Sequence, residues 1–414
     1  MILGVLLVSS GGLTVRHLAF GAKDHRFDPS KRSKLFLGLI SPLTTSWCPE
    51  DDLLVKKIST HHLFDIYNVK ALPTGLAYTV KTRSQSAKSS PAIESYFIRE
   101  DEATRYLNDL IEGLTAKILA FDVKLATAVQ EDLSGYETLW HRIIDQSRVD
   151  HGITCCMARL LAQLHRVTSS LHINKDKQKE IQQIFRTSTV SELSVEQAFT
   201  KLLQIDSLGA DLDQEVRTAA ESTMRQPHFV ATVNAVKEIY ASNRKCVIHG
   251  NINLCSIIIK DQLHIKFVDF GYAQMGPGTY DLGTLVAGYM TAYYVHILTE
   301  EDSSSHRQVA HCMLDSVRKT IDTYLEQVSA SGTDEQYRIT FFQEVTAFTA
   351  IQLITRALNS TSCSDCDLSA NVRVNILQSG HRLLSKYSAI DNVFDRRKYL
   401  AIDGHYKLRK TDGF

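Results

Sequence analysis

The polar residues between Cys246 and Met290 are the part of this chain whose types and spacing could do chemistry. The triplet 249–251 reads His-Gly-Asn, Ser256 follows shortly after it, and Asp269 comes directly after an alternating run, 263–268, that predicts a strand. Carboxylate and hydroxyl oxygens suit Mg²⁺, and phosphoryl transfer uses such a metal beside a group that accepts the proton of the attacking hydroxyl. Asp269 and Ser256 therefore carry the types of oxygen ligand that a bound Mg²⁺ needs.

These motifs resemble the aminoglycoside phosphotransferase and choline kinase branch of the kinase-like superfamily. In that branch a His-Gly-Asp triplet precedes a short loop, a strand and a metal-binding Asp. The segment 276–283, GPGTYDLG, is similar to methylthioribose kinase in particular. The resemblance implies an α+β class and a bilobed protein-kinase-like fold, with a small antiparallel-sheet N-lobe and a mostly helical C-lobe.

The catalytic frame departs from the family at one position, because Asn251 stands where the family has its catalytic Asp. An amide keeps the shape of a carboxylate but accepts no proton at neutral pH, and general acid or base catalysis contributes about 10²- to 10⁴-fold. The resemblance gives Asp269 the role of metal ligand, with Ser256 as a weaker second ligand. His249 fits a buried residue that orders the loop better than a base, and Asp281 fits a helix-start anchor. The sequence predicts a damaged catalytic site.

The resemblance also places nucleotide-binding residues upstream. Three short alternating runs predict strands of the smaller lobe: 55–58, 64–69 and 76–81. Lys81 is the candidate for the strand lysine that pairs the phosphates. The segment 98–107 reads as the acidic start of a helix, in which Glu100 is the candidate partner of that lysine and Glu102 the second choice.

Two further segments keep the family's order. Residues 117–134 resemble a strand pair followed by the hinge that contacts adenine in methylthioribose kinases, and the hinge residues are Glu131, Asp132 and Leu133. Residues 157–168 then resemble the helix that packs under the catalytic loop.

Other positions depart from the family. The turn at 59–63 contains His61 and His62 but no glycine, so it would hold a triphosphate poorly. The two histidines could bind a metal, or form only an exposed turn. Gly271 replaces an acidic residue, and Arg356, near the end of a predicted helix, is the one survivor of a substrate-side arginine pair.

Composition sets outer bounds. The 414 residues are 44% hydrophobic, and Lys plus Arg (46) equals Asp plus Glu (46), which gives no global electrostatic reason to expect nucleic acid or an anionic membrane as a partner. We expect an N-terminal extension over 1–50, an N-lobe with hinge over 51–133 and a helical C-lobe over 134–414. Within that lobe, 178–225 resembles the helical insertion that shapes the acceptor pocket of small-molecule kinases.

Cysteines and the N-terminus bear on the compartment. The eight scattered cysteines favour a reducing environment, and Cys363 and Cys366 lack the second ligand pair that a zinc site needs. The apolar run 2–8 is too short to span a bilayer, so no membrane span is expected. We expect a cytoplasmic protein, with a mitochondrial targeting segment as the alternative.

Three hypotheses remain. The chain is a pseudokinase with a structural or regulatory role, docked to protein partners in a larger assembly. Alternatively, it is an active ATP-dependent kinase of a small hydroxyl substrate, with methylthioribose as the first candidate. The third possibility is a nucleotide-binding sensor without turnover. ATP and Mg²⁺ are expected to bind weakly or not at all in the first case.

Overall fold

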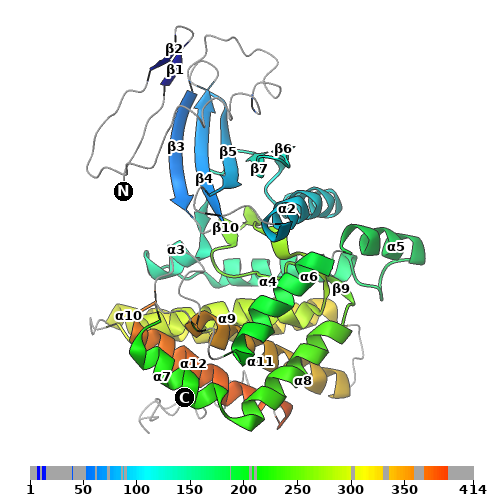
Figure 1. The fold of residues 1–414 in the computed structure, drawn as a ribbon, viewed down its shortest axis with the longest axis vertical. Coiled ribbons are helices and arrows are strands. Elements are labelled where there is room, and N and C mark those ends of the chain that lie inside the picture. Colours follow the sequence, from blue (N-terminus) through cyan, green and yellow to red (C-terminus); the bar gives the residue numbers. More distant parts are fainter. Residues whose placement is uncertain are drawn as a thin grey trace. The chain divides into compact units, whose positions relative to one another are not determined.

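The protein divides into two compact units between Tyr136 and Glu137, the first and second unit below (Figure 1). The computed structural model describes residues 7–9, 12–14, 40, 53–60, 63–71, 75–84, 87, 91–186, 188–204, 208, 212–299, 304–329, 335–358 and 368–389. Most of the expected N-terminal extension, His61, His62, Cys363 and Cys366 lie outside the described residues. The expected α+β class is confirmed, with an antiparallel sheet in the first unit and mostly helices in the second.

The first unit is built on a five-stranded antiparallel sheet in the order β3-β4-β5-β7-β6. The strands are β3 (Leu53–Thr60), β4 (Phe64–Ala71), β5 (Ala77–Arg83), β6 (Ile118–Asp122) and β7 (Thr127–Gln130), and a separate hairpin pairs β1 (Leu7–Ser9) with β2 (Gly12–Thr14). Alternation along β4 and β5 gives the sheet a buried face on which Tyr67, Val69 and Val80 are at most 1% exposed. The three predicted strands therefore form, and they lie side by side.

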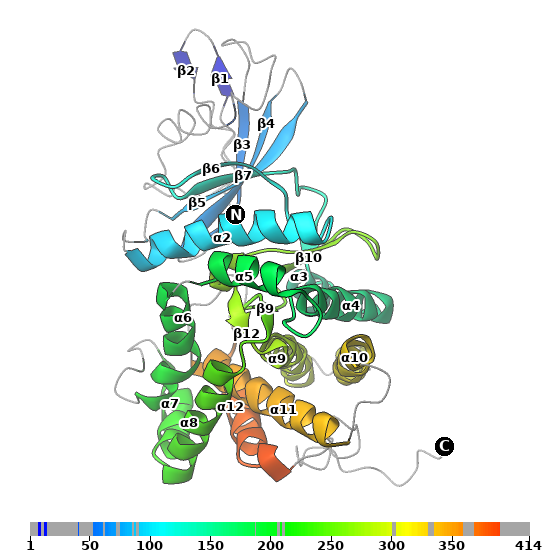
Figure 2. The same ribbon diagram turned by 90° about the vertical axis from the view of Figure 1, so that its right-hand side faces the viewer.

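Helix α2 (Pro91–Leu110) packs beside β6 within this unit (Figure 2). The prediction that a helix starts near Ile98 is wrong, because the helix begins at Pro91. Proline is well suited to the first helical position, where its missing N–H costs no hydrogen bond. Glu100 therefore lies in the middle of the helix, where its side chain is directed by packing rather than by the helix dipole.

The second unit is mostly helical. Its helices are α3 (Leu139–Ile144), α4 (His151–Val167), α5 (Lys175–Ile184), α6 (Ser188–Val195), α7 (Gln214–Met224), α8 (Pro227–Ser242), α9 (Gly278–Ile297), α10 (Ser304–Val328), α11 (Glu335–Leu358) and α12 (Ala370–Leu384). Two short sheets carry the functional loops: β8 (Glu137–Thr138), β10 (Ile257–Ile259) and β11 (Ile265–Phe267) form one, and β9 (Cys246–Ile248) and β12 (Gln274–Gly276) form the other. Short helical turns lie at Glu196–Thr200, Lys201–Leu203, Phe270–Tyr272 and Tyr387–Ala389.

Helix α9 forms the core of the second unit. Every residue from Tyr280 to Tyr294 is buried, and the helix contacts α4, α10, α11 and α12. A helix that is buried all round needs neighbours on every side. The start of α9, next to β12 and β9, is therefore held in a fixed position, which matters for the loop that follows β9.

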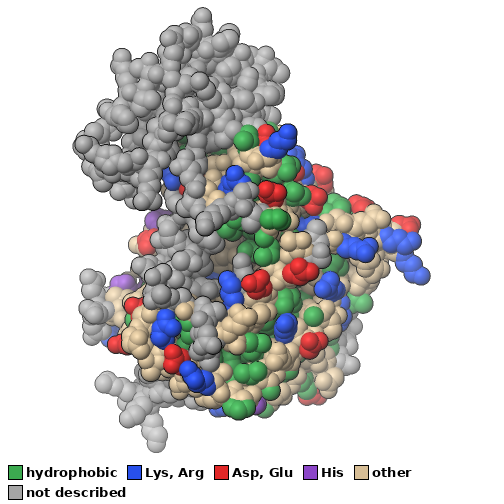
Figure 3. Space-filling view, viewed as in Figure 1, with side chains coloured by type: hydrophobic (Ala, Val, Ile, Leu, Met, Phe, Trp, Pro, Cys, Tyr) green, Lys and Arg blue, Asp and Glu red, His purple; other side chains and the backbone are tan. Residues whose placement is uncertain are grey.

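On the face shown in Figure 3, acidic and basic side chains of the described residues are interspersed. Among the described residues, no helix is long and apolar enough to cross a membrane.

Candidate functional site

The loop after β9 takes a conformation that only glycine allows at its centre. Gly250 has φ +82°, and a Cβ at this position would collide with the backbone carbonyl of Tyr272. Positive φ costs glycine nothing, because it has no side chain to clash with the backbone. Gly250 thus lets the loop turn close to Tyr272, and the half-buried Asn251 follows it directly.

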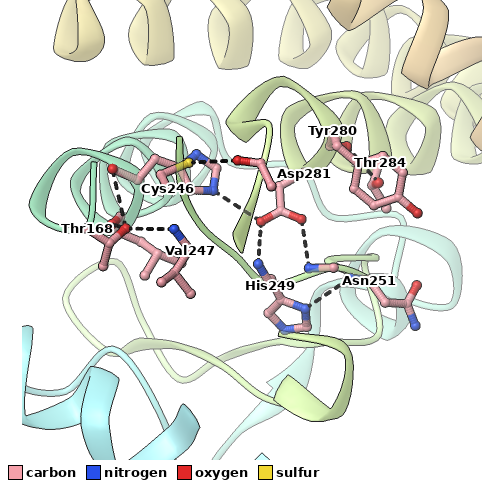
Figure 4. Close-up of polar contacts among 12 residues, drawn as sticks. Thr168, Cys246, Val247, His249, Asn251, Tyr280, Asp281 and Thr284 are labelled. Carbon is pink, nitrogen blue, oxygen red and sulfur yellow. Dashed lines mark hydrogen bonds and ion pairs between the residues drawn. The ribbon is translucent and has the colours of Figure 1, made fainter. Parts of the chain in front are cut away.

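A buried carboxylate fixes the backbone of this loop (Figure 4). The Asp281 carboxylate, which is fully buried in the first turn of α9, accepts hydrogen bonds from the backbone N–H groups of His249 (2.6 Å) and Gly250 (3.0 Å). Its Oδ2 atom also lies 3.1 Å from Nε2 of His165 on α4, whose Nδ1 lies 2.7 Å from the Tyr324 hydroxyl. The expectation that Asp281 anchors its own helix start needs correction, because its backbone partners belong to the loop after β9.

His249 is engaged at both ring nitrogens. Its Nε2 lies 2.8 Å from the carbonyl oxygen of Val268, and its Nδ1 accepts a hydrogen bond from the Asn251 N–H at 3.3 Å. The first contact requires a proton on Nε2 and the second requires a lone pair on Nδ1, so the ring is neutral. Complete burial also lowers the pKa of His249. The geometry suits a residue that orders the loop.

Asn251 is half-buried, and its side chain points away from Asp281 and His249 in Figure 4. Within the described part of the chain, its amide group makes no hydrogen bond. The backbone carbonyl of Asn251 accepts hydrogen bonds from the Asn253 N–H (2.9 Å) and the Ser256 hydroxyl (3.3 Å). The backbone of Asn251 is therefore held by the fold, whereas its amide group takes no part in the described hydrogen bonds.

Ser256 is 1% exposed, and Asn253 holds the turn that leads to it. The Asn253 Oδ1 atom accepts hydrogen bonds from the backbone N–H groups of Cys255 (2.8 Å) and Ser256 (3.2 Å). Because the Ser256 hydroxyl donates to Asn251, its lone pairs stay available to a metal. Its role as a ligand stays a prediction.

Asp269 has a left-handed backbone, with φ 71° and ψ 48°, and precedes the turn Phe270–Tyr272. A non-glycine residue in this conformation is uncommon and persists only where the surroundings impose it. Here the preceding Val268 donates its N–H to the Ser256 carbonyl at 2.9 Å, and Phe270 packs its ring 4.4 Å from that of His249. The two loops thus hold each other, and the carboxylate of Asp269 is half-buried.

The donor set fits a hard cation bound through phosphates. Among the described residues, no group of three or more His, Cys, Asp or Glu side chains could hold a metal ion alone. Mg²⁺ is usually bound by one or two carboxylates together with substrate phosphates and water. Asp269 could supply that carboxylate, with Ser256 and the oxygen of Asn251 as neutral donors.

In the first unit, Lys81 and Glu100 form a buried ion pair. Lys81 Nζ lies 2.7 and 2.8 Å from the two carboxylate oxygens of Glu100, and the residues are 3% and 4% exposed. The pair joins β5 to the middle of α2. The alternative partner, Glu102, instead lies 3.4 Å from Arg99 and is about half exposed.

The hinge residues follow β7 and are tied down within the first unit. Glu131 accepts a hydrogen bond from the Lys117 N–H at its side chain (2.7 Å) and donates its own N–H to the Lys117 carbonyl (3.0 Å). Asp132 is exposed and accepts from the side chain of Asn68 (3.2 Å). The N–H of Leu133 donates to the hydroxyl of Thr79 at 3.1 Å.

Several residues of these sites had no role assigned from the sequence. Thr168 accepts a hydrogen bond from the Val247 N–H at 3.1 Å, so the helix run 157–168 holds β9 through Thr168 and the loop through His165. The only sequence feature that pointed to Thr79 was its position two residues before Lys81 on the same strand. Arg356 lies half-buried in the last turn of α11, and its substrate role stays a prediction.

Known proteins share this sequence pattern. The chain is 22% identical to the methylthioribose kinase of Bacillus pumilus over 293 residues, which cover 66% of this chain and 71% of the relative. It is 23% identical to the methylthioribose kinase of Yersinia enterocolitica over 308 residues, 68% of this chain and 74% of the relative.

The fold is also shared with a solved structure. The ethanolamine kinase of Plasmodium vivax superposes with a TM-score of 0.51 at 15% sequence identity, and the superposition covers 87% of this chain and 95% of that one. Residues 96–302, half of the chain, match the phosphotransferase enzyme family known as APH. The kinase-like resemblance expected from the motifs is thereby confirmed, and the chain belongs to the APH phosphotransferase enzyme family.

Proposed function

We propose that this chain is a pseudokinase, a member of the phosphotransferase family that has kept the fold but transfers phosphate poorly or not at all. The observation that carries this proposal is Asn251, whose backbone is held in the loop by His249 and Ser256 and whose side chain is an amide. An amide can orient a hydroxyl group but cannot take its proton at neutral pH. The expected loss is about 10²- to 10⁴-fold.

A protein that does not turn over substrate acts through what it binds. We therefore assign this chain a structural or regulatory role, in which the fold presents surface to a protein partner. If Mg²⁺ and ATP bind, Asp269 would hold the metal and Lys81 would face the phosphates, and the metal would neutralise phosphate charge.

The experiment is phosphate transfer from Mg-ATP to methylthioribose and ethanolamine, the alcohols named by the relatives and by the solved structure above. ADP and phosphorylated product are both measured, for the wild type and for Asn251→Asp. We expect no product above background from the wild type, and a gain of at least tenfold for Asn251→Asp with an accepted alcohol. The control is the double variant Asn251→Asp with Asp269→Asn, which removes the metal carboxylate and should abolish the gain.

An active small-molecule kinase is the second candidate, and the intact Lys81–Glu100 pair favours it. A loose transition state leaves little proton transfer to be catalysed, so positioning alone could sustain turnover. Phosphorylated product from the wild type that disappears in Asp269→Asn would establish this candidate and end the pseudokinase proposal.

A further inference from the structure

The groups of the first unit that would meet a nucleotide lie on one face of its sheet. The register pairs Ile66 with Lys81 and Phe64 with Arg83, and directly paired residues share a face. Thr79 lies two residues before Lys81 on the same strand and so belongs to the same face. Phe64, Thr79 and Lys81 are nevertheless 5%, 3% and 3% exposed. At these three residues the face is covered by the protein's own atoms, whereas Ile66 and Arg83 on the same face are half-buried.

The ammonium group of Lys81 already has partners in every direction. It has three N–H donors, and two carboxylate contacts at 2.7 and 2.8 Å go to Glu100. The ring of Phe64 lies over the same nitrogen, 3.8 Å from Nζ to the ring centroid, and the ring of Tyr96 lies at 5.5 Å. Cations are attracted to the face of an aromatic ring. A phosphate oxygen could reach this ammonium group only by displacing the ring.

The backbone donor of the hinge also has a hydrogen-bond partner within the protein. The hinge residue Leu133 donates its backbone N–H to the buried hydroxyl of Thr79 at 3.1 Å. A purine ring nitrogen that used the same N–H would have to replace this hydroxyl. The exchange would gain little, because one hydrogen bond is traded for another.

We propose that Phe64 and Thr79 stand in for the nucleotide in the first unit, with the Phe64 ring in place of a phosphate oxygen at Lys81 and the Thr79 hydroxyl in place of the base at Leu133. The two side chains decide how weakly a purine nucleoside triphosphate binds. This inference deepens the proposed function and rests on it, because it takes the first unit as the nucleotide-binding half of a phosphotransferase. It goes further by assigning weak binding to two residues of the first unit, whereas Asn251 belongs to the second.

The test is the affinity of the full chain for Mg-ATP and for adenosine, measured by titration calorimetry, in Phe64→Ala, Thr79→Val and the double variant. We expect Phe64→Ala to bind Mg-ATP about tenfold more tightly, which corresponds to about 1.4 kcal/mol, and to leave adenosine binding unchanged. Thr79→Val, which keeps the side-chain shape, should tighten both ligands by a smaller factor. The two gains should multiply in the double variant.

The matched control is Val80→Ala. Val80 lies between Thr79 and Lys81 but on the opposite face and is fully buried, so its truncation loosens the same strand without opening the nucleotide face. It should leave both affinities unchanged. Phe64→Leu serves if Phe64→Ala does not fold, because it removes the aromatic ring face while keeping apolar bulk, and it should give a smaller gain for Mg-ATP.

Two results would overturn the inference. In one, the wild type binds Mg-ATP as tightly as the variants, so the face is open in solution. In the other, Phe64→Ala or Thr79→Val weakens binding, which would make these side chains ligand contacts. Neither result bears on turnover, because the proposed function fails only if the wild type transfers phosphate.

Discussion

The two units stabilise their key polar groups in different ways. In the first unit, the central contact joins two side chains, Lys81 and Glu100, each of which depends on the other. In the second unit, the Asp281 carboxylate binds backbone N–H groups of the loop that precedes Asn251. Any residue type has a backbone N–H except proline. The shape of the loop in the second unit is therefore independent of the chemistry at position 251.

This difference explains how a phosphotransferase fold can carry an amide at position 251. Replacing a carboxylate by an amide there removes no contact that holds the loop, since the Asn251 side chain takes no part in the described hydrogen bonds. A change at Lys81 or Glu100 would leave a buried charge without its partner. Substitutions at the two sites should consequently differ in what they do to stability.

The largest expected effect is at Asp281. Asp281→Asn places an amide among two backbone N–H donors and His165, and breaking a buried charged contact typically costs about 3 to 5 kcal/mol of unfolding free energy. Urea unfolding followed by circular dichroism measures this. The matched control is Asp261→Asn on the exposed pair with His264, which should change stability little. A small effect at Asp281 would mean that the loop is held by other contacts.

Next in size is the Lys81–Glu100 pair. Lys81→Met and Glu100→Leu should each destabilise the protein by about 3 kcal/mol, because each leaves one buried charge unpaired. The double variant should be more stable than the sum of the two losses predicts, since it leaves no charge behind. A double-mutant cycle from urea unfolding gives the coupling energy. Additive losses would show that the pair is solvated and that the contrast between the units is smaller than proposed.

A smaller effect is the pH dependence of the unfolding free energy that buried histidines of the second unit should cause. Burial lowers the pKa of His249 and His296 in the second unit, so the unfolded chain binds protons that the folded chain does not. The folded state keeps its full stability above about pH 6.5 and loses stability as the pH falls below this value, because protons then bind the unfolded chain. His249 alone contributes a loss of at most about 1.4 kcal/mol per pH unit. Glu344, whose pKa is raised by burial, acts in the opposite direction.

Unfolding at pH 7.5, 6.5 and 5.5, in the wild type and in His249→Gln, isolates the contribution of His249. The variant should be less stable at pH 7.5 and should lose less stability on acidification. Equal slopes in the two proteins would contradict the assignment of a neutral, buried imidazole.

The smallest expected effect is the difference in stability loss between two threonines that make the same contact. Thr79 and Thr168 each accept a hydrogen bond of 3.1 Å from a backbone N–H, of Leu133 and Val247 respectively. Thr168→Val should cost about 1 to 3 kcal/mol because Val247 is fully buried and its N–H would be left unsatisfied. Thr79→Val should cost less, since half-buried Leu133 can be reached by water. Equal losses of stability in thermal unfolding would show that water reaches the Leu133 N–H no better than the Val247 N–H.

The outcome for particular residues shows what sequence motifs can predict. The contact between Lys81 and Glu100 could be predicted because each residue belongs to a motif with fixed spacing along one strand or helix. The metal role of Asp269 stays a prediction. The start of α2 was misplaced because the acidic residues near Ile98 imitate a helix start, whereas Pro91 marks the real one. The roles of Phe64 and Thr79 could not be read in advance, because an aromatic ring over an ammonium group depends on strand register.

The sequence alone determined the family, the order of the motifs and the presence of Asn251 in a His-Gly-Asn triplet, because these depend on local residue identity and spacing. Only the tertiary structure decided that Asp281 holds the backbone of the loop and that Phe64 covers Lys81. Such contacts join residues from separate strands, helices and loops, so they exist only after packing has brought those elements together.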